Sequence, residues 1–440
     1  MDFLISLLRG ILGLIILIAM AVIFSNNRKK IDWKLVGSGI TMQILFALFV
    51  LKTNIGRDIF SSISSVFVYL LNFALEGAQF VFGSLAKSPG TQGSMGMFFA
   101  FQVLPTIIFF ASLMSVFYYL GIMQRVVQGI AWVMARLMGT SGAESLSVSA
   151  NIFIGQTEAP LVIRPYIASM TQSELLTIMI GGMAHISCGV MLAYVQMLGM
   201  AYSKSQGFGL DASQLLFARH LITASIMSAP ATMLIAKILI PETEEPLTKG
   251  TVRLKIEKTH SNVIEAAAAG AGDGARLAIN VAAMLIAFIA LIALFNFILI
   301  NVGNWTNLNS YCMQNFGKPL SLELLFGLVF QFIAFAIGVP WKDSLNVGGL
   351  MGIKLVLNEF VAYSKMSDII SLHQLSEKSI IISTYALCGF ANFSSIAIQI
   401  GGISPLAENR RSDIAKLGLK AVLGGTIATW MTATIAGVLY

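Results

Sequence analysis

Two stretches of the chain place acidic side chains inside otherwise apolar sequence. The first, NIFIGQTEAPLVIRPY (151–166), contains Glu158 between a glycine and a proline. The second, NVGGLMGIKLVLNEFVAYSKM (346–366), contains Glu359. A charged side chain at the centre of a membrane helix costs about 2.5 kcal/mol or more, so carboxylates retained there usually bind something. Both are therefore candidate functional residues.

The composition is that of a membrane protein. Of its 440 residues, 56% are hydrophobic and 11% are charged, with a mean hydropathy of +0.81. A soluble domain has roughly 25% charged residues. The net charge of +7 comes mostly from short loops between apolar runs, as in cytoplasmic loops of membrane proteins, which excludes nucleic acid as a partner. The three cysteines, an odd number without metal-ligand spacing, indicate no disulfide framework.

Apolar runs of about 20 residues predict eight membrane-spanning helices. They lie near 4–24, 35–51, 97–120, 174–200, 217–240, 276–301, 379–402 and 417–440. The first has no signal-peptide cleavage site and is expected to be retained. Three interrupted apolar stretches are expected to form interfacial helices at 58–86, 122–138 and 321–338.

Basic residues predict the orientation of these helices. Lys and Arg cluster near residues 28–34, 249–258 and 410–420, which follow the first, fifth and seventh predicted crossings. Cytoplasmic loops carry the excess of basic residues, so these three loops should face the cytoplasm. Both termini are then expected on the outer side of the membrane.

An internal repeat relates the two acidic stretches. GTSGAESLSV, which starts at Gly139, resembles GVPWKDSLNV, which starts at Gly338, and HISCGV (185–190) resembles YALCGF (385–390). The two offsets are 199 and 200 residues. The predicted topology starts one copy outside and the other inside the membrane, an inverted repeat typical of secondary transporters.

The repeat predicts the organisation of an all-α polytopic membrane protein. Each acidic stretch is too broken for one helix and is expected to form a re-entrant hairpin, because irregular backbone at membrane depth must be buried or line a cavity. The expected parts are scaffold helices with an interfacial helix (1–96), a first repeat (97–240) with a hairpin near 142–168, a cytoplasmic linker with an interfacial helix (241–275), and a second repeat (276–440) with a hairpin near 343–366.

The polar groups suit a neutral solute that has hydroxyl groups and one flat end. The two carboxylates with Asn392 and Ser395 suit sugar hydroxyls, the Gln156 and Thr157 pair suits the edge of a base, and Phe390 offers a stacking face. No Arg or Lys cluster is present for phosphate, which favours a nucleoside over a nucleotide.

Structural roles are the alternatives at each position. Glu158 and Glu359 could form salt bridges with local bases, Arg164 and Lys354 respectively. Asn392 and its neighbouring serines could join helices by hydrogen bonds. Val190 and Phe390 could simply pack against lipid or the core.

Three segments, GQTEAPLVIRPY, NEFVAY (358–363) and CGFANFSSI (388–396), resemble the concentrative nucleoside transporters, and the resemblance covers about residues 90–440. It implies trimers of eight-crossing protomers, in which a mobile domain containing both hairpins carries nucleoside past a scaffold by an elevator motion without a cofactor. It also implies roles for the site residues: Gln156, Thr157 and Glu158 face the base, Val190 and Phe390 pack against it, and Glu359, Asn392 and Ser395 hold the ribose.

The resemblance also implies a sodium site near the first hairpin tip, formed by Asn151, Ile154 and Ile186. Sodium-coupled members have a hydroxyl residue where this chain has His185. Sodium prefers oxygen ligands, and histidine can titrate near neutral pH, so a proton is the alternative coupling ion. If His185 points elsewhere, the main-chain carbonyls of that turn could suffice. The remaining sodium-type pattern favours sodium.

These features predict a cation–nucleoside symporter of the bacterial inner membrane, with uridine, cytidine and adenosine as example substrates. The sequence does not fix a preference for purine or pyrimidine nucleosides. Ion and nucleoside would share one rigid element, so each should raise the affinity of the other by the same factor. An intramembrane enzyme using Glu158, Glu359 and His185 is a weaker alternative, since no metalloprotease or nucleophile motif is present. A passive channel would need a continuous polar stripe rather than polar groups at two tips.

Overall fold

The computed structural model describes residues 2–88, 91–250 and 260–440, and 81% of the chain is helical. Over those ranges, eight helices are long and apolar enough to cross a membrane. The described residues contain no β-strand, only one isolated bridge between Ser141 and Lys249. The all-helical expectation is therefore confirmed, and the chain is a membrane protein with about eight apolar helices.

Three long helices precede the repeat. Asp32 and Thr53 cap the second and third of them, because their side-chain oxygens accept hydrogen bonds from the first free backbone N–H groups. The elements are α1 (Asp2–Ile23), η1 (Arg28–Lys30), α2 (Trp33–Lys52), α3 (Asn54–Phe82), η2 (Gly83–Ala86) and α4 (Phe99–Gln102).

The two copies of the repeat contain helices in the same order. The first comprises α5 (Leu104–Tyr119), α6 (Ile122–Met138), α7 (Gly142–Asn151), η3 (Ala159–Ile163), α8 (Arg164–Ile167), α9 (Gln172–Ala184), α10 (Cys188–Gln206) and α11 (Leu210–Leu239). The second comprises α12 (Val263–Trp305), α13 (Leu308–Phe316), α14 (Leu322–Ala336), α15 (Trp341–Val356), α16 (Glu359–Ser371), α17 (Glu377–Ala386), α18 (Phe393–Ile403), η4 (Ser404–Leu406), η5 (Glu408–Arg410) and α19 (Arg411–Leu439).

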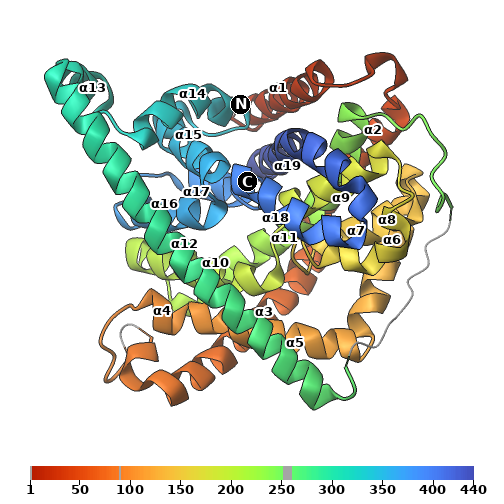
Figure 1. Ribbon diagram of the computed structural model, residues 1–440. Helices are drawn as coiled ribbons and strands as arrows, with labels where there is room; N and C mark the ends of the chain where they lie inside the picture. Colours follow the sequence, from red (N-terminus) through yellow and green to blue (C-terminus); the bar gives the residue numbers. More distant parts are fainter. Residues whose placement is uncertain (1, 89–90, 251–259) are drawn as a thin grey trace.

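The first helices of the two copies pack against each other, and so do the last. The starting helices α5 and α12 are in extensive contact, as are the final helices α11 and α19. Figure 1 shows α12 as a long diagonal helix that passes in front of α5 and α10. Gly139 after α6 and Gly338 after α14 both have positive φ, 70° and 115°, which glycine adopts without strain. The first repeat anchor thus marks the same turn in both copies.

The second repeat departs from the expected helices in two places. The predicted crossing at 379–402 is two helices, α17 and α18, because Leu387–Asn392 leaves the helical conformation. The apolar run could not reveal this break, since Cys388, Phe390 and Ala391 keep the hydropathy high. Helix α12 runs unbroken for 43 residues, so the separate interfacial helix expected before residue 276 is instead its first turns.

The predicted interfacial helices stay predictions. Helix α3 is apolar and long enough to span a membrane, and α14 forms with α15 a pair bent by 119°. Helix α6 buries Met123, Val127, Ala131, Met134 and Met138, which repeat every three or four residues along one face, as in an amphipathic helix.

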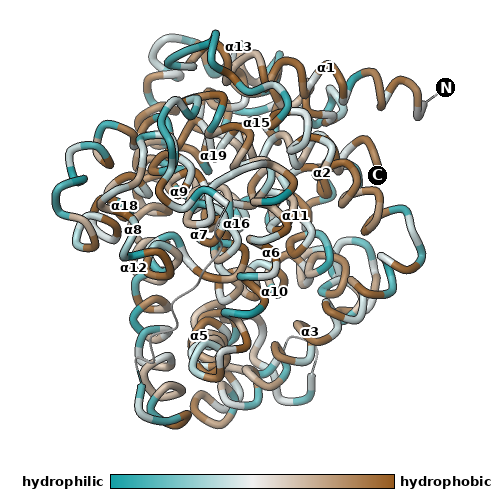
Figure 2. Tube along the Cα trace, turned by 90° about the vertical axis from the view of Figure 1, so that its right-hand side faces the viewer, coloured by the Kyte–Doolittle hydropathy of each residue, from teal (hydrophilic) through white to brown (hydrophobic). Residues whose placement is uncertain are grey.

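Apolar side chains cover the outside of the protein, and its apolar core also contains many polar groups. Figure 2 shows largely hydrophobic outer helices, such as α1 and α3, where Leu4, Leu8 and Phe80 are exposed. In the interior, α7, α9 and α11 bury many hydroxyl and amide side chains. Such a distribution is expected where lipid surrounds the helices and a polar site lies within them.

Candidate functional site

The first acidic stretch breaks the helix as predicted. Helix α7 ends at Asn151, and Ile152–Glu158 form turns before the short η3. Gly155 and Pro160 favour this interruption. The Gly155 N–H donates to Glu158 Oε2 at 3.2 Å, and the Glu158 N–H donates to the Gly155 carbonyl at 3.1 Å. The carboxylate of Glu158 thus closes its own turn, and its side chain is exposed.

The second acidic stretch breaks between α15 and α16. Asn358 caps α16, since its Oδ1 accepts from the Val361 N–H at 2.9 Å. Glu359 is the first residue of that helix and is only 5% exposed. The Glu359 carboxylate therefore lies at the N-terminal end of that helix.

Two further breaks meet each other. His185, Ile186 and Ser187 separate α9 from α10, and Leu387–Asn392 separates α17 from α18. The Phe390 N–H donates to the His185 carbonyl at 3.3 Å, which joins the two interruptions directly. Gly389 lies at this junction with φ 150°, and a Cβ there would approach the Met183 carbonyl oxygen to 2.8 Å. A residue with a side chain would keep the breaks apart.

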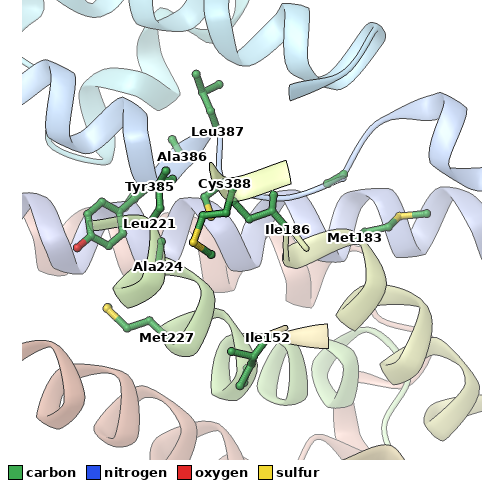
Figure 3. Close-up of a cluster of buried hydrophobic side chains, with 14 of the residues drawn as sticks. Ile152, Met183, Ile186, Leu221, Ala224, Met227, Tyr385, Ala386, Leu387 and Cys388 are labelled. Carbon is green, nitrogen blue, oxygen red and sulfur yellow. The ribbon is translucent and has the colours of Figure 1, made fainter. Parts of the chain in front are cut away.

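Apolar side chains form the core around these breaks. Figure 3 shows Ile152 of the first tip, Ile186 of the α9–α10 break and Ala386 and Cys388 of the α17–α18 break gathered with side chains of α11. Ile152, Ile186 and Ala386 are at most 3% exposed. This packing holds the first tip and the α9–α10 and α17–α18 breaks in one region of the protein.

The structure brings four predicted substrate residues together from separate elements. Glu359 Oε1 accepts from the Tyr194 hydroxyl at 2.8 Å, and Asn392 Nδ2 donates to Glu359 Oε2 at 3.4 Å. Asn392 Oδ1 also accepts from the Ser395 N–H at 2.9 Å and caps α18. Gln156 Nε2 donates to Ser395 Oγ at 3.2 Å and links the first tip to α18. We call Gln156, Tyr194, Glu359, Asn392 and Ser395 the polar cluster.

The other predicted substrate residues lie around the polar cluster without joining its hydrogen bonds. The Thr157 methyl group faces α18, since a Cβ on Gly402 would lie 2.5 Å from it. Val190 is buried, and Phe390 is half-buried in the α17–α18 break. In the described part of the chain, neither Glu158 nor Glu359 forms an ion pair, so the expected alternative of salt bridges to Arg164 and Lys354 is not what the structure shows.

Three oxygens of the predicted ion site are available to a ligand. Asn151 donates its Nδ2 to the Ser147 carbonyl at 3.0 Å, and its buried Oδ1 has no partner within the described ranges. The carbonyls of Ile154 and Ile186 also accept no hydrogen bond from any described residue. Within the described residues, Asn151 Oδ1 and these two carbonyl oxygens are therefore acceptors without a donor.

His185 has one occupied ring nitrogen and one free one. Its Nδ1 lies 2.8 Å from the Gly181 carbonyl, which can only accept, so Nδ1 carries the proton. Its Nε2 is buried without a partner among the described residues. Gly181 also faces the amide of Asn151, since a Cβ there would lie 3.2 Å from Asn151 Nδ2. His185 and Asn151 therefore flank the same turn of α9.

Sequence reasoning missed two polar residues of this region. Tyr194 lies one turn after Val190 on α10 and binds Glu359 directly. Gln399 donates to the Met179 carbonyl at 2.8 Å. Gln399 and Gln156 both lie against Gly182, since a Cβ on Gly182 would approach both side chains. A signal existed for Tyr194, because its hydroxyl interrupts an apolar face at helical spacing from a residue already selected.

Three family descriptions match successive parts of the chain. "Na+ dependent nucleoside transporter N-terminus" matches residues 12–85, "Nucleoside recognition" matches residues 100–201, and "Na+ dependent nucleoside transporter C-terminus" matches residues 220–437. Together they extend over both copies of the repeat and the helices that precede it.

Similar proteins occur in bacteria and animals. The chain is 45% identical to an uncharacterized transporter of Haemophilus influenzae over 98% of this chain and 97% of that protein. It is 39% identical to nucleoside permease NupC of Helicobacter pylori, again over 98% of this chain and 97% of that protein. It is 38% identical to sodium/nucleoside cotransporter 1 of Mus musculus over 97% of this chain and 63% of that longer protein.

Solved structures of CNTnw have the same fold. The inward-facing, substrate-bound form aligns with a TM-score of 0.85 at 41% identity and covers 99% of this chain and 98% of that one. An outward-facing variant aligns with a TM-score of 0.87 at 41% identity and covers 99% of both chains. These relatives are transporters and not enzymes, which removes the intramembrane-enzyme alternative. The chain belongs to the Na+ dependent nucleoside transporter family.

Proposed function

We propose that this protein imports nucleosides such as uridine, cytidine and adenosine across the bacterial inner membrane by symport with sodium. The polar cluster is the observation that carries the proposal. It combines a buried carboxylate, two amides and two hydroxyls from four different elements. Inside a membrane protein, such a cluster suits a neutral solute with many hydrogen-bonding groups.

Glu359 is the carboxylate proposed to hold the ribose. Each of its oxygens accepts one hydrogen bond, from Tyr194 and Asn392, whereas a carboxylate has about four acceptor sites. The remaining sites suit two adjacent hydroxyls, whose hydrogen bonds to a charged acceptor are roughly twice as strong as neutral ones. Asn392 and Ser395 lie next to these sites and complete the proposed ribose contacts.

Gln156 is placed to meet the base. Its Oε1 is buried without a partner in the described structure, so a donor on the base would satisfy it. Thr157, Glu158, Val190 and Phe390 are proposed to complete the base contacts. The Gln156–Ser395 hydrogen bond closes the space between the two halves, so a bound nucleoside would replace this bond with bonds of its own.

Sodium is the proposed coupling ion. Asn151 Oδ1 and the carbonyls of Ile154 and Ile186 are three free oxygens, the ligand type that hard cations prefer. The family descriptions also name sodium. Proton coupling is the second candidate, because His185 places a buried, unpaired imidazole nitrogen beside the same turn of α9.

An elevator motion is the proposed route across the membrane. The hairpins near 142–168 and 343–366 would be re-entrant and would move with the broken helices as one unit. Residues 1–96 and the first helices of each repeat, α5 and α12, would hold a homotrimer in the lipid. CNTnw has been solved in inward-facing, outward-facing and intermediate states, which supports a change between conformations open to opposite sides of the membrane.

Uptake of radiolabelled uridine into proteoliposomes tests the proposed function. We expect accumulation when sodium is higher outside, with competition by unlabelled cytidine and adenosine and none by free uracil, which lacks the ribose. Accumulation that follows an imposed proton gradient and ignores sodium would replace sodium with protons. Uptake that never exceeds the external concentration under either gradient would indicate a channel and overturn symport.

Removing the Asn151 side-chain oxygen should weaken sodium binding. Asn151→Ala is expected to raise the sodium concentration for half-maximal uptake about tenfold, because one of three proposed oxygens is lost. Asn301→Ala is the matched control, since Asn301 Nδ2 also donates to the carbonyl four residues earlier but lies on α12. An unchanged sodium titration of Asn151→Ala would contradict the assignment.

Neutralising Glu158 should have a smaller effect than neutralising Glu359. In Glu158→Gln the side chain keeps an oxygen that can accept from the Gly155 N–H, and this position is exposed. We therefore expect uridine affinity to fall only about tenfold, which corresponds to the loss of one charge-assisted hydrogen bond. Competition assays measure this change. Glu245→Gln, at an exposed glutamate after α11, is the control. Wild-type affinity in Glu158→Gln would remove Glu158 from the proposed site.

A further inference from the structure

One buried cation has no carboxylate partner within ion-pair distance among the described residues. Lys354 lies in the last turn of α15 and is 2% exposed. Its ammonium donates to the Ala386 carbonyl at 3.0 Å and to Thr429 Oγ1 at 3.2 Å. The Thr429 hydroxyl itself donates to the Thr426 carbonyl, which leaves its oxygen free to accept from Lys354. Burying an ammonium group is costly, so this arrangement requires an explanation.

Helix capping explains only part of it. Helix α17 ends at Ala386, and the last carbonyls of a helix lack backbone donors. Lys354 supplies a donor to one of them, but a neutral side chain could do the same at lower cost. The charge also interacts electrostatically with the Glu359 carboxylate of the polar cluster. The positive charge is therefore located where the second break and the proposed ribose contacts meet.

The internal repeat relates the position of Lys354 to the proposed sodium site. At the offset of 200 residues that relates the two Cys-Gly anchors, Ala386 corresponds to Ile186, and Lys354 lies in the second acidic stretch as Ile154 lies in the first. The carbonyls of Ile154 and Ile186 belong to the proposed sodium site. In the first copy the carbonyl at the α9–α10 break is free, whereas in the second copy its counterpart accepts from an ammonium group.

We propose that the Lys354 ammonium is a tethered cation that occupies, in the second half, the place that sodium occupies in the first. Both carry one positive charge and both are held by carbonyl and side-chain oxygens. A tethered cation is always present, so it stabilises the backbone conformation of the second break without an external ion. It also keeps a positive charge near Glu359. Only the first break then depends on an external ion.

The consequence for coupling rests on the proposed sodium symport. The two cation positions are the proposed sodium site at the first break and the Lys354 ammonium at the second. Because Lys354 fills the second position, the protein takes up one external cation per nucleoside. Sodium activation of the wild-type protein should therefore be non-cooperative, with a Hill coefficient of about one. A coefficient near two in the wild-type protein would overturn the proposal, whatever any variant does.

Two variants separate the charge from the volume of the side chain. Lys354→Met keeps most of the volume without the charge and should lower uridine binding to the purified protein at least about tenfold, with no recovery in added cations. Lys354→Ala opens the space, so ethylammonium should restore binding to that variant and not to Lys354→Met. Thermal unfolding with and without uridine reports binding independently of transport.

The outcomes distinguish this proposal from the proposed function. Wild-type uridine binding in Lys354→Met would overturn the tethered cation, as would a folded Lys354→Ala that neither ethylammonium nor sodium restores. If wild-type uptake ignores sodium, the sodium symport fails, but the ethylammonium experiment still decides whether a cation is required beside Ala386. Lys342→Met, at a lysine in the exposed first turn of α15, controls for loss of a lysine from that helix.

Discussion

Glu359→Gln is expected to lower uridine uptake by two to three orders of magnitude while the protein still folds. The carboxylate is buried at the start of α16, where it already orders the Tyr194 hydroxyl and the Asn392 amide. Gln would offer one acceptor oxygen in place of two, and its NH₂ group would face donors. The loss of two charge-assisted hydrogen bonds to ribose, at about 1.5–3 kcal/mol each, corresponds to roughly 100-fold or more in affinity.

Uptake in proteoliposomes and uridine-dependent thermal stabilisation measure this effect separately. Asp368→Asn is the matched control, because Asp368 lies on the same helix and is exposed. We expect 2′,3′-dideoxyuridine to bind the wild-type protein as weakly as uridine binds Glu359→Gln, since the same pair of contacts is missing. Uridine affinity within threefold of wild type in Glu359→Gln would contradict the ribose assignment.

The overall fold was largely predictable because lipid imposes simple rules. Long apolar runs predicted membrane helices, and the all-helical class follows because a helix satisfies its own backbone groups in lipid. Gly389 and Asn392 indicate an interruption near Leu387–Asn392, but hydropathy did not divide the helix there because Cys388, Phe390 and Ala391 are apolar. The break is stabilised by tertiary contacts such as Phe390 N–H to the His185 carbonyl. Likewise, nothing in the sequence of 263–275 separates an interfacial helix from the first turns of α12.

The candidate site was predictable where a residue type is rare at membrane depth. Carboxylates and amides in apolar sequence marked Gln156, Glu359 and Asn392, and the structure brings these together with Ser395. Their binding roles remain predictions. Tyr194 was missed because tyrosine is common in membrane helices, although its position one turn after Val190 was a signal; its contact with Glu359 shows its place. From the sequence, Lys354 is only an alternative salt-bridge partner of Glu359, since sequence alone cannot show that its ammonium reaches the Ala386 carbonyl.

Gly182→Ala is expected to reduce uridine affinity about 10- to 100-fold, although Gly182 is not itself a proposed substrate contact. A Cβ on Gly182 would lie 2.6 Å from Gln399 Nε2, 2.8 Å from Gln156 Cβ and 3.3 Å from Gln156 Cα. Gln399 can rotate away, but Gln156 cannot yield without moving its backbone and its hydrogen bond to Ser395. Overpacking of this kind costs about 1–3 kcal/mol. At Gly182 this cost would appear as a loss of uridine affinity, because Gln156 is displaced.

Gly401→Ala is the matched control for this substitution. Gly401 lies on α18, and no atom lies within 4 Å of an added Cβ, so the same change there should leave uridine affinity unaltered. Competition binding to purified protein measures both variants, and size-exclusion chromatography confirms that they fold. If Gly182→Ala folds and binds uridine within twofold of wild type, the position of the Gln156 side chain does not determine uridine affinity.

Because ion and nucleoside binding are linked, a loss of uridine affinity through Gln156 should also reduce the effect of uridine on sodium binding.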